Sequence, residues 1–589
     1  MLTKVPTLDT TNDPYKWRED QGVLSRCARP CRGMWYDVKR RLPYYWSDIV
    51  DGFNYRTFAG TIRIFFVNLL PALAFQLDMN HNTGGFFGVN EALLSSALAA
   101  IVFSTLSAQP LTVVGITGLI SLFNYTIYDI IKIYDVSIYP QFMVWVGIWA
   151  AIWHWAVAIT NLCDYMRCIT DFSAQTFGLY VGTIYVLKGI EELAVNFYDD
   201  QILNGFASAM LAILFYLTIF YLEKLPSTSF ARTPVRRFLS DYAYPLATIF
   251  WTGFSWFPGN LSYVPWNRIP RTRAFYPTVD RPWVVDFWNL EAKWVFVALP
   301  MGFLMMLLFY YDHNVSSLTA QARDFPLKKP AGFHWDFFLL GCTCFVGGVL
   351  NIPLPNGLVP QAPVHTDGLT TYDDKPDYII TKDHPSEPVI VRHQMKALKV
   401  AEQRISHFVM GIAFVVTMTG PLLVCLSLIP RALLSGVFFT VGLGGIFTNP
   451  ILVHKIKFLC TDPRFIPSHE PLLKVSRRQV AHYLGWQLLG WACTVAISQT
   501  IAAIGFPVLI MALIPLRWKL LPRLFTREEL EIMDDMTVTG EVVLASLGGK
   551  PELPENKLAR IKEEKKHMDP EHGNAGLTGG MGVATGAQA

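Results

Sequence analysis

Residues 351–363 read Asn351-Ile352-Pro353-Leu354-Pro355-Asn356-Gly357-Leu358-Val359-Pro360-Gln361-Ala362-Pro363. They lead into an apolar piece, residues 357–368, that is too short and too broken to cross a bilayer, because a full span needs about 20 apolar residues. Proline removes a backbone N–H and disfavours helix before it, so no continuous helix is expected here. A second short apolar piece, residues 109–122, opens Gln109-Pro110-Leu111. We therefore expect two half-length helices that begin inside the membrane.

Longer apolar segments surround these two pieces. Twelve of them are predicted to cross the bilayer, at residues 57–77, 90–106, 143–163, 172–193, 203–223, 237–257, 292–312, 336–352, 408–428, 431–447, 480–500 and 503–520. In chain order the two broken pieces are the third and the tenth apolar segments. If segments 8–14 are counted as a second set of seven, the tenth segment is the third of its set. Interrupted segments at matching ranks indicate inverted repeats with a substrate site between them. The predicted fold is an all-α integral membrane protein of fourteen segments, arranged as a 7+7 inverted repeat.

The composition agrees with a membrane protein. Hydrophobic residues make up 52% of the chain and charged residues only 16%, against roughly 25% charge in soluble domains. The 49 Lys and Arg against 46 Asp and Glu give 49 − 46 = +3, too small a net charge for binding nucleic acid. The nine cysteines have no metal-ligand spacing, and the chain has no phosphate-binding loop or hydrolase motif. We expect no metal, no cofactor and no enzyme activity.

Loop charges set the predicted topology. Basic residues cluster in loops that lie inside if the N-terminus is cytoplasmic, whereas loop 258–290 is basic yet falls outside. The predicted organisation is a cytoplasmic N-terminal segment, a first repeat, an extracellular loop, a second repeat and a cytoplasmic, partly disordered tail. Their bounds are 1–50, 51–257, 258–290, 291–525 and 526–589. Both termini are expected on the cytoplasmic side.

The two breaks carry the predicted substrate site. A helix that begins in mid-membrane leaves free N–H groups and about half a positive charge at its N-terminus. Two such ends that face each other can hold a small oxyanion without Lys or Arg. We expect one helix to start at Gln109 and Pro110 and the other at Pro360 and Gln361. The predicted substrate-binding residues are Gln109, Pro110, Thr112, Thr117, Asn356 and Gln361. A simple proline kink is the alternative for either segment taken alone.

Asp312 and His313 are the predicted coupling residues, at the end of span 292–312. A carboxylate near mid-membrane costs about 2.5–3.5 kcal/mol on insertion scales, which favours a role in pairing, coupling or proton transfer. In the alternative, the span ends earlier, Asp312 lies in the interface and His313 is a packing residue.

Four motifs resemble those of the bicarbonate-transporter superfamily, which contains anion exchangers and boron transporters. They are Ser107–Gly115, Gly332–Asp336, Glu402–Ser406 and Ile429–Phe438, and the resemblance covers roughly residues 45–535. It implies a core of segments 1–4 and 8–11, a gate of segments 5–7 and 12–14, and a homodimer through the gate.

Within that superfamily, Phe309–His313 and Leu354–Thr366 look most like the plant and fungal boron transporters. Animal anion exchangers have Glu where Asp312 stands and Arg where Gln361 stands. A fixed guanidinium favours a permanently charged anion. A neutral amide beside helix N-termini favours a weaker charge or a neutral hydroxylated solute, and boric acid is mostly neutral near pH 7.

The resemblance implies a secondary active transporter that exports borate or boric acid across the plasma membrane by moving the core against the gate. Protons are the candidate coupling ion, and the vacuolar membrane is the alternative location. The alternative function is bicarbonate or chloride exchange by the same fold. Three other classes have less support. A channel would not need paired half-helices, an intramembrane enzyme would need convergent catalytic groups, and a scaffold would leave the costly polar groups in mid-membrane without a purpose.

Overall fold

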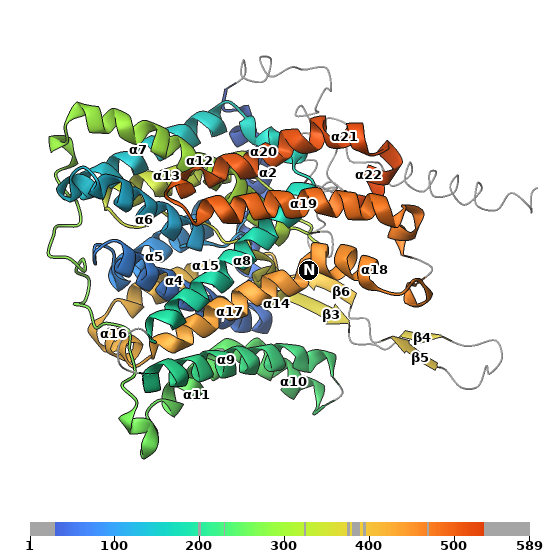
Figure 1. Ribbon diagram of the computed structural model, residues 1–589, viewed down its shortest axis with the longest axis horizontal. Coiled ribbons are helices and arrows are strands. Elements are labelled where there is room, and N and C mark those ends of the chain that lie inside the picture. Colours follow the sequence, from blue (N-terminus) through green and yellow to red (C-terminus); the bar gives the residue numbers. More distant parts are fainter. Residues whose placement is uncertain are drawn as a thin grey trace, which may run out of the picture.

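The computed structural model describes residues 30–197, 202–228, 230–322, 325–373, 377–379, 389–392, 396–467 and 470–534, with 537 and 543. The predicted N-terminal segment before residue 30 and most of the predicted tail lie outside these residues. Figure 1 shows long helices lying side by side, with two small strand pairs and the short helices α18 and α22 towards one end of the molecule.

Helices dominate the described chain, as predicted. They are α2 (Arg32–Arg41), α3 (Tyr45–Val50), α4 (Tyr55–Asn82), α5 (Val89–Leu106), α6 (Gly118–Lys132), α7 (Tyr139–Ile159), α8 (Asp171–Val195), α9 (Ile202–Lys224), α10 (Thr233–Asp241), α11 (Ala243–Phe254), α12 (Ala292–Ala320), α13 (Phe333–Val349), α14 (Gln361–Gly368), α15 (Ile405–Thr417), α16 (Gly420–Ser427), α17 (Arg431–Thr448), α18 (Lys457–Cys460), α19 (Arg477–Ser498), α20 (Phe506–Lys519), α21 (Leu521–Leu524) and α22 (Arg527–Met533).

Short strands add to this helical fold. They are β1 (Val114–Gly115), β2 (Asn356–Gly357), β3 (Thr370–Asp373), β4 (Asp377–Ile379), β5 (Val389–Arg392) and β6 (Lys396–Val400). β3 pairs with β6 and β4 with β5, both antiparallel, in the polar loop between α14 and α15. The expectation of an all-α chain therefore holds for the spanning helices but not for this loop or for β1 and β2.

Seven described helical segments are long and apolar enough to cross a membrane, and each lies at a predicted span. An eighth predicted span, 408–428, is the pair α15 and α16, bent by 87°. Predicted span 237–257 is likewise split into α10 and α11. Both breaks have the same cause: α15 ends four residues before Pro421 and α10 four residues before Pro245, where the missing N–H removes a helical hydrogen bond.

Helix α12 is longer than predicted, and this corrects the placement of Asp312 and His313. They do not end the span, because the helix continues to Ala320 with both residues buried in its interior. Two of the polar side chains that follow donate to carbonyls one turn earlier: Asn314 to that of Tyr310 at 2.6 Å, and Gln321 to that of Ser317 at 3.0 Å. The helix thus runs on through the protein interior instead of stopping at an interface.

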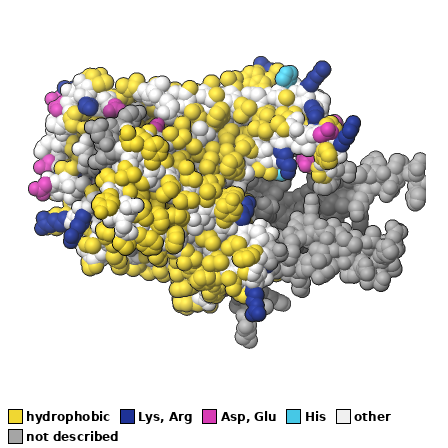
Figure 2. Space-filling model, turned by 60° about the horizontal axis from the view of Figure 1, so that its bottom comes forward, with side chains coloured by type: hydrophobic (Ala, Val, Ile, Leu, Met, Phe, Trp, Pro, Cys, Tyr) yellow, Lys and Arg dark blue, Asp and Glu magenta, His cyan; other side chains and the backbone are white. Residues whose placement is uncertain are grey.

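The surface is that of a membrane protein. Figure 2 shows hydrophobic side chains over the broad middle of one face, with most Lys, Arg, Asp and Glu side chains towards its two ends. Exposed Trp and Phe side chains such as Trp46, Phe206 and Phe296 contribute to the apolar surface. A soluble protein rarely exposes so large an apolar area, so lipid is its natural cover.

Helix contacts come in pairs that relate the two halves. Helix α5 packs on α15 and α7 on α13, which in segment order is second on eleventh and fourth on ninth. If each segment of the first half is exchanged with its counterpart in the second half, the pair α5–α15 becomes the pair α13–α7. The pair α8–α17, fifth on twelfth, is unchanged by the exchange (Figure 1). At the α7–α13 crossing a Cβ on Gly147 would lie 2.7 Å from the Gly348 Cα, so only glycine permits this approach. These pairs support the inverted repeat, which remains a proposal.

Candidate substrate site

Two extended segments, one from each half of the chain, meet inside the helix bundle. β1 and β2 pair antiparallel, with Val114 opposite Gly357 and Gly115 opposite Asn356. All four residues are buried. Each strand leads within a few residues into a short helix, α6 or α14. The pairing satisfies backbone groups that lipid could not, and it brings the starts of the two helices together.

The first arm, residues 107–117 with α6, differs from the prediction. α6 begins at Gly118, so Gln109 and Pro110 do not start it and lie instead at a turn before β1. The reason is the pairing of Val114 and Gly115 with β2, because a helix that began at Gln109 would need those two residues in helical conformation. Asp336, a buried carboxylate, accepts the N–H groups of Ala108 and Gln109 at 2.5 and 2.9 Å and holds the arm ahead of that pairing. Thr117 is the N-cap: its hydroxyl accepts the Ile120 N–H at 3.3 Å.

The second arm, residues 351–360 with α14, follows the prediction. α14 begins at Gln361 with Pro360 as its N-cap residue, and no side chain caps it. The Ala362 N–H is donated to the Leu358 carbonyl at 3.0 Å, so backbone alone supports the start of this helix. Gln361 is 1% exposed, yet neither its Oε1 nor its Nε2 has a hydrogen-bond partner among the described residues. An unpartnered buried amide is costly, so this position calls for a ligand or water.

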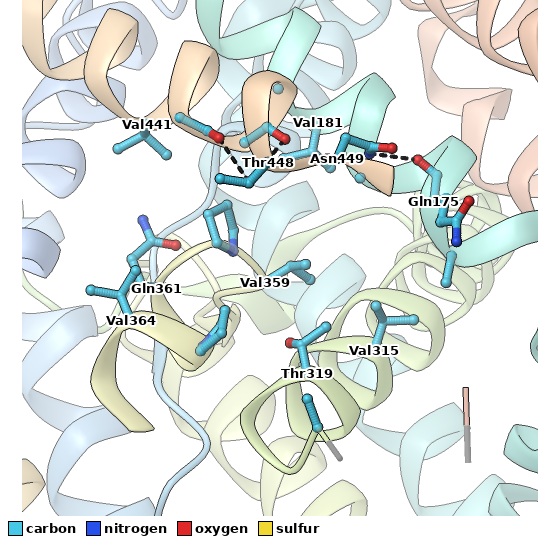
Figure 3. Close-up of a pocket in the computed structure, with 18 of the residues that line it drawn as sticks. Gln175, Val181, Val315, Thr319, Val359, Gln361, Val364, Val441, Thr448 and Asn449 are labelled. Carbon is cyan, nitrogen blue, oxygen red and sulfur yellow. Dashed lines mark hydrogen bonds between the residues drawn. The ribbon is translucent and has the colours of Figure 1, made fainter. Parts of the chain in front are cut away.

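A cavity of about 1020 Å³ opens beside this second arm. Its walls come from α8 and α17 on one side and from α12, α14 and α4 on the other. Figure 3 shows α17 across the cavity from the start of α14, with Val441 facing Gln361 and Thr448 facing Val359. The Gln361 amide is directed into the space below α17 (Figure 3). The lining is largely apolar, with a few polar groups, as small-molecule sites commonly are.

Of the eight residues predicted to bind or couple, Gln361 lines this cavity and the other seven do not. Gln109 and Thr112 are fully buried. Asn356 donates from Nδ2 to Asp312 Oδ2 at 2.8 Å and accepts the Gly357 N–H at 2.7 Å. Asp312 therefore touches the strand crossing through Asn356.

His313 lies in the packed interior behind the same crossing. Its ring is edge-on to Phe103, with the centroids 5.4 Å apart. Its Cα lies so close to β2 that a Cβ on Gly357 would be 2.6 Å away. This supports the packing alternative for His313.

Sequence reasoning missed most of the cavity wall. Tyr185 of α8, Thr319 of α12 and Thr448 of α17 are polar lining residues that were not predicted. On α17, Val441, Gly444, Gly445 and Thr448 recur at helical spacing and all line the cavity. That run of small residues on one helix face was the signal available in the sequence.

Charged groups collect at the mouth of the cavity. Arg63 of α4 lies 3.1 Å from Glu223 of α9 and 3.5 Å from Asp367 of α14, and both carboxylates line the cavity. The lining also includes Phe325 and His454, which sit in loops predicted to be cytoplasmic. This arrangement therefore opens the site towards the predicted cytoplasmic side.

A second cluster of charged residues, around Asp48, contacts the start of the first arm. Asp48 is fully buried and receives Arg41, Lys329 and Arg404 at 2.7 to 3.0 Å. Arg404 also donates to the Ser107 carbonyl at 2.7 Å, where the first arm begins. Burial raises the pKa of the nearby Glu402 carboxyl, and the positive charges of Arg41 and Lys329 partly oppose this rise. Burial also lowers the pKa of Arg404. This cluster fixes the end of α5 and the start of the arm.

Comparison with known proteins agrees with this architecture. The family model described as "HCO3- transporter integral membrane domain" matches residues 29–208 and 203–538. The chain belongs to this HCO3⁻ transporter family. It is a multi-pass membrane transport protein.

Two relatives and one solved structure illustrate the spread of this HCO3⁻ transporter family and its fold. Boron transporter 1 of Saccharomyces cerevisiae is 42% identical over 527 residues, 88% of this chain and 88% of that protein. Band 3 anion transport protein of Gallus gallus is 25% identical over 556 residues, 90% of this chain and 58% of that protein. The inward-facing structure of murine Solute Carrier 26 family member A9 shares the fold at 11% identity and a TM-score of 0.52, covering 84% of this chain and 72% of that one.

Proposed function

We propose that this protein is a secondary active transporter that exports borate or boric acid across the plasma membrane. A core containing α4, α12 and α14 would move against a gate containing α8 and α17, with both termini cytoplasmic and a homodimer formed through the gate. Similarity to a fungal Boron transporter 1 supports the substrate. The cavity between these two helix sets supports the motion.

The observation that carries this proposal is the state of Gln361. Its buried amide has a free donor and a free acceptor at the uncapped start of α14, and it lies in the cavity wall. A hydroxylated acid uses all three features, because its hydroxyls can both donate and accept and its partial negative charge suits a helix N-terminus. A chloride ion would use only the donors.

The test is boron flux in vesicles that contain the purified full-length protein. We expect saturable boron uptake that protein-free vesicles lack. Gln361→Arg should reduce boron flux and favour bicarbonate or chloride, because a fixed guanidinium selects a permanent anion. Bicarbonate counterflow by the unaltered protein without boron flux would overturn the proposed substrate and support the exchanger alternative, to which the similarity with Band 3 also points.

Asp312 is the proposed coupling group. Its carboxylate accepts a hydrogen bond from Asn356, which sits in the strand crossing, so its protonation state acts on the joint between the two arms. A proton on Asp312 would let the core cross without a buried charge, and one charge moved through 100 mV costs about 2.3 kcal/mol. Asp312→Asn should remove the pH dependence of boron flux. An unchanged pH profile in the same vesicles would show that the coupling group lies elsewhere.

A further inference from the structure

Two kinds of glycine occur where α8 and α17 form the wall of the cavity. Gly182 and Gly442 lie at the contact between these helices, where a Cβ on Gly442 would meet the Gly182 carbonyl oxygen at 2.8 Å. Close packing explains those two. Gly444 has no atom within 4 Å of an added Cβ, and for Gly445 the nearest is 4.0 Å away. Packing in this structure therefore does not require glycine at 444 or 445.

Gly444 and Gly445 nevertheless sit inside a helix, where glycine is less favourable than alanine. With Val441 and Thr448 they form one face of α17, at spacings of three and four residues, and this face lines the cavity. Figure 3 shows the face between Val441 and Thr448 opposite Val359 and Gln361. Gly444 and Gly445 of α17, which have no side chains, thus lie across the cavity from the start of α14.

A second observation points to a ligand at the same place. Gln361 is 1% exposed, lines the cavity, and has neither amide atom partnered among the described residues. Both features are explained if the two walls come together around a small molecule: the amide then finds its partner, and Cβ atoms at 444 and 445 would occupy the room that the molecule needs.

We propose that Gly444 and Gly445 are the gate half of the substrate site, kept free of side chains so that the start of α14 can close on a small polyhydroxy acid. The two glycines set the upper size limit of the substrate, while Gln361 and the α14 N-terminus read its hydroxyls and charge. This inference rests on the proposed function.

The first test is a series of side chains at the two positions. Gly444→Leu and Gly445→Leu should lower boron flux by about tenfold or more, since an added side chain blocks closure, and Gly445→Ala should lower it less. The melting temperature should stay equal or rise, because the added atoms meet open space in a helix. The matched control is Gly485→Leu on α19, where an added Cβ also has no neighbour within 4 Å and the residue lies outside the cavity wall.

Two results of that series would overturn the inference. One is normal boron flux in both leucine variants, and the other is a loss of flux that tracks a fall in melting temperature, as a purely structural glycine would give. If the unaltered protein moves no boron at all, the proposed function fails and the inference about its substrate fails with it. If it moves boron and the leucine variants do too, the inference alone fails.

A second test detects the closed arrangement directly. Cysteines introduced by Val359→Cys and Thr448→Cys lie on opposite walls of the cavity and leave both glycines in place (Figure 3). A disulfide needs their Cα atoms within about 7 Å, so it can form only when the walls approach. We expect an oxidant to join them in membranes, faster with boric acid present, and each single variant to give the background from native cysteines. Absence of the disulfide in a double variant that still transports boron would overturn the inference.

Discussion

The two arms that cross at β1 and β2 have similar designs and different uses. In the first arm, Asp336 holds backbone N–H groups and Thr117 caps α6. In the second arm α14 starts without a side-chain cap, and Gln361 keeps a free amide in the cavity wall. The backbone of the first arm is thus held by protein groups. Its buried Gln109 Nε2 and Thr112 hydroxyl also have no partner among the described residues, but they do not line the cavity as Gln361 does.

This difference indicates which polar groups of the two arms contribute to stability and which contribute to transport. Groups that are already paired contribute to folding, and changing them should cost stability. A buried group left unpaired, such as the Gln361 amide, costs stability, so changing it should reduce transport without reducing stability. The four predictions below test this division, from the largest expected effect to the smallest.

Asp336→Ala should have the largest effect on stability. The carboxylate accepts two buried N–H groups, and leaving them without a partner should lower the free energy of unfolding by about 3 kcal/mol. A thermal melt of the purified protein in detergent measures this. Asp286→Ala, an exposed residue in the loop before α12, is the control and should melt like the unaltered protein. Equal melting of both variants would show that the first arm does not depend on this carboxylate.

Gln361→Leu and Gln109→Leu form a matched pair across the two arms. Gln361→Leu should lower boron flux by about tenfold or more, ~1.4 kcal/mol, with an equal or higher melting temperature, because the buried amide makes no hydrogen bond with the protein. Gln109→Leu should leave the KM for boron unchanged, since Gln109 lies outside the cavity wall. If both variants raise the KM alike, both arms bind substrate and the division drawn above is wrong.

Thr117→Ala should lower the free energy of unfolding by about 1 kcal/mol, the usual cost of losing an N-cap hydroxyl. Thr117→Ser keeps the hydroxyl and should retain most of that stability. Chemical or thermal unfolding of the two variants side by side measures the difference. A transport defect in Thr117→Ala without loss of stability would instead place this hydroxyl in the substrate site.

Glu402→Gln should have the smallest effect, and it is best seen in the pH dependence of stability. Burial raises the pKa of Glu402 in the folded protein above its unfolded value. Its contribution is therefore fully present below the unfolded pKa and is lost as pH rises through the folded pKa. The glutamine variant should lose less stability than the unaltered protein between acidic and neutral pH. Parallel melting curves across that range would show that Glu402 does not contribute in this way.

The sequence by itself determined the class of fold and one half of the site. Apolar length predicted the spans because bilayer thickness sets that length, and the prolines around 351–363 predicted a helix that starts at Gln361, as it does. Chemistry local to that stretch was enough, since proline acts on its own backbone and on the residue before it.

Only the tertiary structure decided the rest. The start of α6 at Gly118 depends on the pairing of β1 with β2, more than two hundred residues away in the chain. The interior position of Asp312 depends on the neighbouring elements that bury the second part of α12. The glycine face of α17 lines a cavity only because α14 lies opposite it. The physical reason is common to all three: a backbone or side-chain group is satisfied by whatever folding brings beside it, and sequence order does not contain that partner.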